Sequence, residues 1–471
     1  MLTRRRVDPM LPIDRIEPFD PIDSSESSDQ RDHRDVEVRT SGILDAVARP
    51  GNCSRLDAAR FGNTINTVLT GRCGSRGRRQ VRGAPRRDRR RFAAAAMALC
   101  CAGLIAFAPA ASGAGTFSVV ASPNPTGSTG SHLNGVSCVS ASNCTAVGYY
   151  ATSSSPGRTL VERWNGTTWS IIPSPNPTGS TGGYLNSVSC VSASNCTAVG
   201  YYTTASSPGR TLVERWNGTK WSIIPSPNAT GSIGSYLNAV SCTAATSCAA
   251  VGYSYNSTAT KTLAARWNGT NWAVSASPNP SGDDPALFSV SCASATNCLA
   301  VGNYTSTSGS DATLAERWNG TKWSIVASPT PKGSDSYLNA VSCASGTYCI
   351  AVGSTYPATG PGRTLVERWN GSAWAIVSSP SPAGVNESWL SGVRCRSATT
   401  CTAVGASSAT SDKTLVERWN GSAWVIVASP NPTESTASYL NDVSCVTATA
   451  CTAVGDWRGS SPYRTLIERS T

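Results

Sequence analysis

The sequence predicts an all-β protein, a seven-bladed β-propeller of four-stranded blades, and three observations support this. First, a unit of 50 to 52 residues returns seven times between residues 115 and 471, and such a fixed period is typical of a solenoid, propeller or array. Second, each unit holds four short strand signals and no helical periodicity. Third, the last unit lacks its fourth strand, and a spare copy of that strand precedes the first unit.

Paired cysteines with five residues between them set the register of the repeat. We expect each pair to form a disulfide that closes a hairpin, as in exported proteins, and to contribute about 2 kcal/mol. Metal binding is the alternative, but the chain has two histidines and no CxxC spacing, so no metal site is expected. The pairs are Cys138/Cys144, Cys190/Cys196, Cys242/Cys248, Cys292/Cys298, Cys343/Cys349, Cys395/Cys401 and Cys445/Cys451.

The second unit illustrates the four strands, which we predict at residues 185–190, 196–201, 211–216 and 221–225. Asn217-Gly218 separates the last two and predicts a type I′ turn. Four antiparallel strands without a helix favour a propeller blade over a solenoid coil.

The ends of the array favour a closed ring over an open stack. The last unit stops at Arg469, before the Trp-Asn-Gly-x-x-Trp hairpin and the fourth strand, whereas Phe117-Ser-Val-Val aligns with Trp169-Ser-Ile-Ile. We therefore expect the N-terminal strand to complete the last blade, which would close the ring and remove its exposed edges.

The residues before the repeats predict export. Residues 81–114 contain a basic run, an apolar stretch and small residues, the three parts of a secretory signal peptide. Cleavage after Ala110 or Ala114 is expected, with an uncleaved membrane anchor as the alternative. Residues 1–80 are polar and charged, so we expect a disordered leader or a true start nearer residue 81. The localisation expected is secreted or cell-envelope.

Charge argues against nucleic acid as a partner. The whole chain carries +11, but residues 115–471 hold 19 Lys+Arg and 15 Asp+Glu, or +4. This Ser/Thr/Gly-rich body has no basic stripe of the kind that nucleic acid requires.

One set of positions is a candidate binding site at the mouth of the central channel, because the first strand of a blade is innermost. Aromatic residues stand six positions before the first cysteine and amides stand four before it, an arrangement suited to a polar ligand. Packing between blades is the alternative. The aromatic positions hold His132, Tyr184, Tyr236, Ala286, Tyr337, Trp389 and Tyr439. The amide positions hold Asn134, Asn186, Asn238, Phe288, Asn339, Ser391 and Asn441.

Other repeated motifs favour structural roles. The Trp-Asn-Gly-x-x-Trp tryptophans are expected to pack between blades, with sugar stacking as the alternative, and the Glu-Arg pairs to form ion pairs or hydrogen bonds. The connections from the second to the third strand (149–158 in the first unit) and between units (174–183) are expected to be long loops on one face, where binding tends to occur. Residues unique to one unit are assigned to these loops: Asp283, Asp284, Arg394, Arg396, Asp456, Trp457 and Arg458.

The sequence predicts a binding module. His132 is the one histidine after residue 114, which excludes most histidine-based triads, and no signature nucleophile, catalytic residue or cofactor motif is present. We expect a monomer that recognises a polysaccharide, another cell-surface polymer or a protein. The alternatives are a carbohydrate hydrolase or lyase with an acidic pair in the channel, and a scaffold without a ligand.

The units have the form SCxSAxxCxAVG…TLxERWNGxxWxxVxSPNP, and with it residues 115–471 resemble exported bacterial β-propeller repeat proteins of unknown function. They are more distantly similar to the kelch/galactose-oxidase and Asp-box propellers. Trp164 stands where an Asp box has its aspartate, and the kelch Gly-Gly doublet is absent. The resemblance therefore implies the fold but no catalytic residues.

Overall fold

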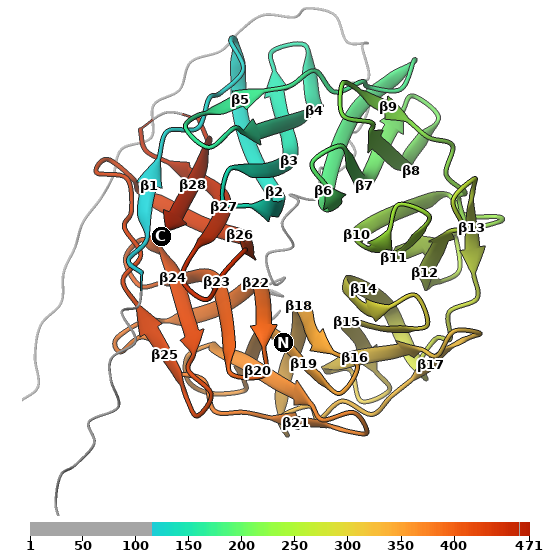
Figure 1. Ribbon diagram of the computed structural model, residues 1–471. Coiled ribbons are helices and arrows are strands. Elements are labelled where there is room, and N and C mark those ends of the chain that lie inside the picture. The colour runs from blue at the N-terminus through green and yellow to red at the C-terminus, as the bar shows by residue number, and fades with distance from the viewer. Residues whose placement is uncertain (1–114, 461) are drawn as a thin grey trace, which may run out of the picture. The chain divides into compact units, whose positions relative to one another are not determined.

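The computed structural model describes residues 115–460 and 462–471, and our expectations for residues 1–80 and 81–114 lie outside them. Every regular element in the described residues is a β-strand (Figure 1). Each of the first six repeats contributes an innermost, a second, a third and an outermost strand in that order, whereas the last contributes the first three of these and β1 precedes the first repeat. The innermost strands are β2 (Ser128–Ser140), β6 (Ser180–Ser192), β10 (Gly234–Ala244), β14 (Gly282–Ser294), β18 (Ser334–Ser345), β22 (Glu387–Ser397) and β26 (Ala437–Cys445).

The remaining strands follow the same order outward from the centre of the arrangement. The second strands are β3 (Asn143–Thr152), β7 (Asn195–Thr204), β11 (Ser247–Tyr255), β15 (Asn297–Ser306), β19 (Tyr348–Pro357), β23 (Thr400–Ser408) and β27 (Cys451–Arg458). The third strands are β4 (Ser155–Trp164), β8 (Ser207–Trp216), β12 (Thr260–Trp267), β16 (Asp311–Trp318), β20 (Arg363–Trp369), β24 (Asp412–Trp419) and β28 (Arg464–Ser470). The outermost strands are β5 (Trp169–Ile171), β9 (Trp221–Ile223), β13 (Trp272–Ser275), β17 (Trp323–Ile325), β21 (Trp374–Ile376), β25 (Trp424–Val427) and β1 (Ser118–Val120).

Within a repeat the strands pair antiparallel in sequence order. In the second repeat Cys190 lies opposite Cys196, Cys196 opposite Trp216, and Trp216 opposite Trp221. Single parallel pairs such as Gly157 with Gly182 join some neighbouring repeats, so the sheets contain four, eight or twelve strands. The predicted four-stranded unit is therefore present, but some of its copies are bridged to the next.

The hairpin between the third and outermost strands differs from the predicted type I′ turn. Gly218 has a φ of 100°, whereas Asn217 is not among the residues with positive φ, which a type I′ turn requires at both central positions. Instead the Asn217 side-chain oxygen accepts hydrogen bonds from the backbone N–H groups of Thr219 and Lys220. An asparagine that bonds its own loop in this way favours an Asx turn.

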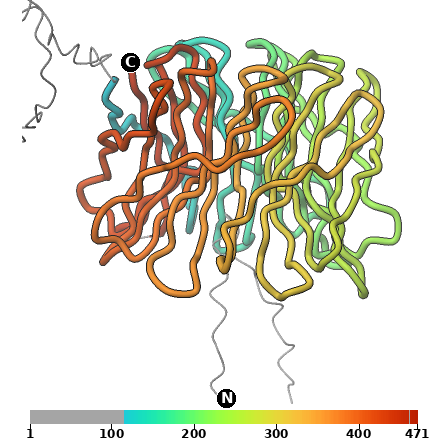
Figure 2. The backbone as a smooth tube through the Cα atoms, turned by 90° about the horizontal axis from the view of Figure 1, so that it is seen from below, coloured from blue at the N-terminus to red at the C-terminus, as the bar shows by residue number. Residues whose placement is uncertain are grey.

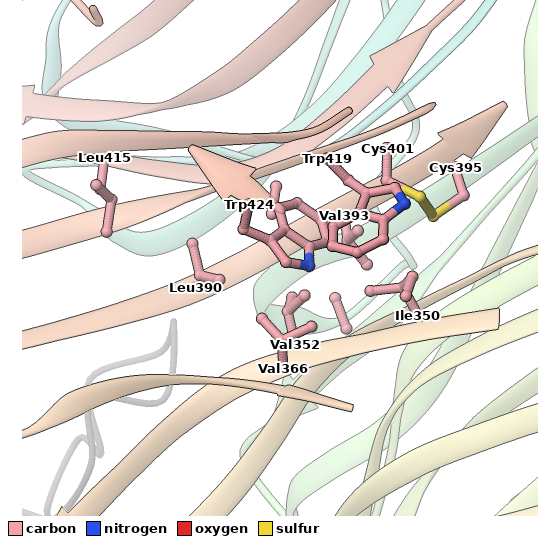
Figure 3. Packing of buried hydrophobic residues seen from close by; sticks show 12 residues of the cluster. Ile350, Val352, Val366, Leu390, Val393, Cys395, Cys401, Leu415, Trp419 and Trp424 are labelled. Atoms are coloured by element: carbon pink, nitrogen blue, oxygen red, sulfur yellow. A yellow bond between two sulfur atoms is a disulfide. The ribbon is translucent and has the colours of Figure 1, made fainter. Parts of the chain in front are cut away.

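The hydrophobic cores lie between neighbouring repeats. In the cluster of Figure 3, Ile350, Val352 and Val366 of one repeat pack against Leu390 and Trp419 of the next. Both tryptophans of each Trp-Asn-Gly-x-x-Trp motif are buried, as the structural interpretation of the motif predicts. Each core is thus shared by two sheets, which is why one repeat alone would leave an apolar face uncovered.

The two ends of the array meet. The N-terminal strand β1 pairs antiparallel with β28, with Val119 opposite Glu468, and Figure 1 shows the two side by side. Phe117 enters the core cluster of the last repeat, and β2 contacts β26, β27 and β28. The N-terminal strand therefore takes the place of the missing outermost strand.

All seven predicted cysteine pairs are disulfides, and each joins an innermost strand to the second strand of its repeat. This number of bonds indicates an oxidising compartment. In the stretch from residue 115 onward that the structure describes, no helix has the length and apolarity needed to cross a membrane. The bonds are Cys138–Cys144, Cys190–Cys196, Cys242–Cys248, Cys292–Cys298, Cys343–Cys349, Cys395–Cys401 and Cys445–Cys451.

Besides closing its hairpin as predicted, the second cysteine of each pair is buried in a hydrophobic core. Cys248, for example, is 2% exposed and belongs to the same cluster as Trp267 and Trp272. Each of these cysteines belongs to a different hydrophobic core, so the disulfides also fill space between repeats. Because the second cysteines are buried, no ligand can reach them. These are Cys144, Cys196, Cys248, Cys298, Cys349, Cys401 and Cys451.

Candidate functional site

The strands run between two faces, where the chain turns back (Figure 2). We call one of them the aromatic face: it carries the turns between second and third strands (153–154 in the first repeat) and the connections between repeats (172–179). The expectation of long loops at residues 149–158 is wrong, because β3 and β4 extend into a tight hairpin there. Alternating side chains on these longer strands, rather than loop residues, therefore present the face.

The residues unique to one repeat also lie in strands, so their assignment to loops is corrected. Asp283 and Asp284 lie in β14, Arg394 and Arg396 in β22, and Asp456, Trp457 and Arg458 in β27. A difference between copies shows that a side chain has changed. It does not show whether the backbone at that position is a strand or a loop.

A row of aromatic rings follows the aromatic face across three repeats and the seam, by which we mean the junction of the last repeat with the first. Rings from the innermost and second strands stack within a repeat, as in His132–Tyr149 (ring centroids 4.7 Å apart) and Tyr184–Tyr201 (4.7 Å). Edge-on contacts then cross between repeats, as in Tyr149–Tyr184 (5.0 Å). This aromatic arc comprises Tyr463, His132, Tyr149, Tyr184, Tyr201, Tyr236, Tyr253 and Tyr255.

Strand register explains both the arc and its end. Tyr236 lies directly opposite Tyr253 in the antiparallel ladder, where cross-strand side chains meet. In the four later repeats the position of Tyr253 holds Asn303, Ser354, Ala406 and Asp456, so the row stops. Sequence reasoning missed the second-strand tyrosines, although their recurrence four residues after a buried Thr-Ala-Val or Ala-Ala-Val start was a usable signal.

The aromatic positions predicted from the sequence lie between neighbouring repeats. Tyr184 and Tyr337 are 4% and 5% exposed, whereas His132, Tyr236, Trp389 and Tyr439 are half-buried. The Tyr184 ring lies so close to Gly157 that a Cβ added to this glycine would overlap it. The Tyr439 hydroxyl donates a hydrogen bond to Asp412. Only the half-buried members of this set keep surface for a ligand.

The predicted amide positions connect one repeat to the next. Asn134 donates from Nδ2 to the carbonyl oxygen of Leu185 at 3.0 Å, and Asn186, Asn238, Asn339 and Asn441 make the equivalent bond. One amide N–H of each of these side chains therefore holds neighbouring innermost strands together.

The seam carries the most varied chemistry of the aromatic face. His132 Nδ1 lies 3.4 Å from Asp456 Oδ1, and Asn441 donates to the same oxygen at 3.2 Å. The Arg458 guanidinium lies over the Tyr463 ring, 5.2 Å from its centroid. Beside them is an open cavity of about 300 Å³, which is lined by Asn124, Ser128, Pro462, Tyr463 and Arg464.

The opposite part of the aromatic face is acidic. Asp335 accepts a hydrogen bond from the backbone N–H of Asp311, and the Tyr337 hydroxyl donates to Asp311 at 2.5 Å. In the sixth repeat, burial and the negative charge of Asp412 raise the pKa of Glu387. Carboxyl groups on this part of the face therefore lie beside tyrosine hydroxyls, as Asp311 does beside Tyr337.

The repeated Glu-Arg pairs are structural, and hydrogen bonds rather than ion pairs hold them. Glu162 is fully buried and accepts a hydrogen bond from Ser122 of the segment before its repeat. The Arg163 guanidinium instead lies over Trp216 of the next repeat, 4.5 Å from the ring centroid. Burial raises the pKa of Glu162 to about 8, although the Ser122 hydrogen bond opposes the shift.

No set of three or more His, Cys, Asp or Glu side chains that could hold a metal ion is present among residues 115–460 and 462–471.

Four-stranded antiparallel units around a common axis, with cores between them, define this protein as a β-propeller. No protein-family model matches the chain, and no curated protein matches it in sequence.

Several solved structures are similar in fold. YCF48 bound to D1 peptide is 14% identical, with a TM-score of 0.47 over 75% of this chain and 95% of that chain. A PL25 polysaccharide lyase, an ulvan lyase, is 9% identical, with a TM-score of 0.47 over 72% and 97%. A mutant Aleuria aurantia lectin in complex with Fucalpha1-6GlcNAc is 12% identical, with a TM-score of 0.39 over 66% and 99%.

Proposed function

We propose that residues 115–471 form a closed seven-bladed propeller which is exported and binds a polysaccharide or another cell-surface glycan at its aromatic face. The contacts would come from the half-buried rings of the arc and from the seam cavity. Trp389 and Tyr439, which are half-buried members of the predicted mouth, extend the surface beyond the arc. Binding, rather than catalysis, is the function.

The aromatic arc is the observation that carries this proposal. Aromatic side chains combine a flat apolar surface with, in tyrosine, a polar hydroxyl, and a sugar ring likewise has apolar faces and a polar rim. His132, Tyr149, Tyr236, Tyr253 and Tyr255 each keep part of their surface. Their stacked order gives a row of such surfaces, as an extended polymer would require.

The seam cavity adds the convergent polar groups that binding sites use for orientation. Asn124, Ser128 and Arg464 line the cavity together with the Tyr463 ring. Tyr463 also contacts His132, with ring centroids 5.0 Å apart, so the cavity continues directly into the arc. A glycan chain could therefore place one sugar unit in the cavity and the following sugar units along the aromatic rings.

Closure of the ring and export are supported by separate observations. Asn441 bonds to Leu133 as Asn134 bonds to Leu185, which supports a junction between the last and first repeats of the same kind as the one between the first and second. The disulfides support passage through an oxidising compartment, and the signal peptide predicted at residues 81–114 would supply the route.

The test is a glycan and cell-wall polysaccharide array probed with the full-length protein from an oxidising host. Tyr463→Ala and Tyr255→Ala should each reduce binding about tenfold or more, the range expected for loss of an aromatic contact. Tyr304→Ala is the matched control, because Tyr304 is half-buried on β15 and lies outside the arc. Absence of saturable binding, or equal losses in all three variants, would refute the proposal.

The acidic half of the face favours one second candidate, a carbohydrate hydrolase or lyase. Such enzymes need one carboxyl group with a raised pKa beside a second carboxylate, and Glu387 has a raised pKa with Asp412 as its negative neighbour. Release of reducing ends from a polysaccharide that Glu387→Gln abolishes would establish this function in place of simple binding. A folded protein that neither binds nor cleaves any polysaccharide would favour the remaining alternative, a scaffold without a ligand.

A further inference from the structure

A second feature lies on the innermost strands, away from the aromatic face. The residue before the first cysteine is serine in six repeats, and its Oγ accepts a hydrogen bond from the backbone N–H of the corresponding cysteine in the next repeat. The Ser137 Oγ to Cys190 N distance, for example, is 3.0 Å. The position holds Ser137, Ser189, Ser241, Ser291, Ser342, Arg394 and Ser444. In the sixth repeat Arg394 stands in place of the serine, so this serine hydrogen bond is absent there.

A second arginine follows in the same strand. Two residues after Arg394 stands Arg396, where the other repeats have Val139, Val191, Thr243, Ala293, Ala344 and Val446. Residues two positions apart in an extended strand lie roughly 7 Å from each other along it, so the two arginines of β22 are near neighbours. Desolvation by the surrounding chain lowers the pKa of Arg394, and the positive charge of Arg396 lowers it further. Both side chains are nevertheless exposed to solvent, so a solute can reach them.

The nearest acid does not pair with these arginines. Asp442 of β26 raises the pKa of Arg394, but its Oδ2 accepts from the backbone N–H of Val136 at 2.9 Å and its Oδ1 from that of Val443 at 2.8 Å. Over the residues that the structure describes, neither the Arg394 nor the Arg396 side chain makes a hydrogen bond or salt bridge. Two guanidinium groups are left with their donors free.

This arrangement is unfavourable without a ligand. Like charges that are partly desolvated repel each other, and the sixth repeat has also lost the serine bond that its neighbours keep. Departures from a local rule of this kind are expected at functional sites. An anion would remove the repulsion, since the planar guanidinium presents paired N–H donors that match the two oxygens of a carboxylate, sulfate or phosphate group.

We propose that Arg394 and Arg396 form an oxyanion-binding site at the inner edges of β22 and β26. The group bound is a carboxylate, sulfate or phosphate, either as a free ion or as part of a larger ligand. The site is separate from the aromatic arc: Arg394 lies five residues along β22 from Trp389, or roughly 16 Å at the rise of an extended strand. It does not depend on the glycan-binding proposal.

The test uses the neighbouring repeats as its guide. Arg394→Ser with Arg396→Val restores the residues of other repeats and should leave the fold intact, because the new serine can accept from Cys445 N–H. Arg363→Ser is the control, since it removes an exposed arginine of β20 and half the charge of the double variant. Calorimetric titrations of the full-length proteins would use sodium sulfate, sodium phosphate and oligogalacturonate at constant low ionic strength.

We expect saturable binding of at least one probe by the native protein, and a loss of about tenfold or more in the double variant, because it removes both charged hydrogen-bond donors from the anion. The control should retain its affinity. Binding of sulfate or phosphate would identify a site for a free ion, whereas binding of oligogalacturonate alone would identify an acidic group on a polymer. Failure of all probes to bind, or equal losses in the control, would overturn the proposal.

Discussion

Asn441 Nδ2 lies 2.9 Å from the carbonyl oxygen of Leu133, which stands 308 positions earlier in the chain. The same bond joins Asn134 to Leu185 in the next pair of repeats, at 3.0 Å. Interactions that hold ordinary neighbours together therefore also hold the last repeat against the first. If the seam is energetically equivalent to the other junctions, the substitutions that weaken it should cost the same.

Substituting alanine at either asparagine tests this equivalence. Asn134→Ala should lower the free energy of unfolding by about 1 kcal/mol, the usual contribution of one hydrogen bond. Asn441→Ala should lower it by at least as much, because Asn441 also donates to Asp456. Denaturant unfolding of both variants under identical conditions provides the measurement. A loss at Asn134 with none at Asn441 would show that the seam contributes little to the folded state.

The buried glutamates predict lower stability at higher pH. The pKa is raised to about 8 for Glu162 and Glu214 and to about 7 for Glu316, from an ordinary value of 4.5, chiefly through burial. The folded state therefore holds these protons more tightly than the unfolded chain. Their stabilising contribution is complete below about pH 4.5 and is lost as pH rises toward 7–8.

Denaturant unfolding between pH 5 and 8 measures this effect. The free energy of unfolding should fall with increasing pH, and Glu162→Gln should make the decline shallower, because an amide remains neutral and can still accept from Ser122. An equal or steeper decline in the variant would mean that Glu162 does not hold its proton in the folded state.

The contact between Gly157 and Tyr184 predicts that substitutions at these two residues have coupled effects on stability. Gly157→Ala would drive a Cβ into the Tyr184 ring, and overpacking of this kind typically costs about 1–3 kcal/mol. In a Tyr184→Ala background the ring is gone, so the same glycine substitution should cost much less. A double-mutant cycle in denaturant measures the coupling, and strictly additive losses would contradict the packing described here.

The disulfides predict a stability loss that is similar in every repeat. Replacing Cys190 and Cys196 together by alanine removes the closed loop from the unfolded chain and should lower the free energy of unfolding by about 2 kcal/mol. Alanine is chosen because Cys196 is buried, where a serine hydroxyl would add a cost of its own. The pair Cys445/Cys451, beside the seam, serves as the comparison. Unchanged stability in both variants would show that the bonds do not restrain the unfolded state.

The repeat made most of the architecture predictable from the sequence. Cysteine spacing defined the disulfides, and the spare strand around Phe117 indicated its partner, because both follow from comparing copies within one chain. Comparison of copies could not reveal contacts between strands or between repeats. It therefore left out Tyr149, whose importance depends on lying opposite His132, and the burial of cysteines such as Cys248 in the cores.

The errors have a common physical origin. Arg394 and Arg396 differ from their counterparts and were assigned to a loop, yet they occupy β22, whose backbone conformation is set by pairing with β23 rather than by its side chains. Asn217-Gly218 indicated a turn, but not the side-chain hydrogen bonds that determine its type. In both cases the local conformation, a strand in one and the turn type in the other, depends on hydrogen bonds to the backbone that residue identity alone does not indicate.

Calorimetric titration of a polysaccharide selected on the array, with native, Tyr463→Ala and Tyr304→Ala proteins, tests the central proposal most directly. Glycan binding at the arc and seam predicts saturable binding by the native protein and by Tyr304→Ala, with a loss of about tenfold or more for Tyr463→Ala. Equal affinities for all three proteins, with folding unchanged, would contradict it and place the ligand elsewhere on the propeller.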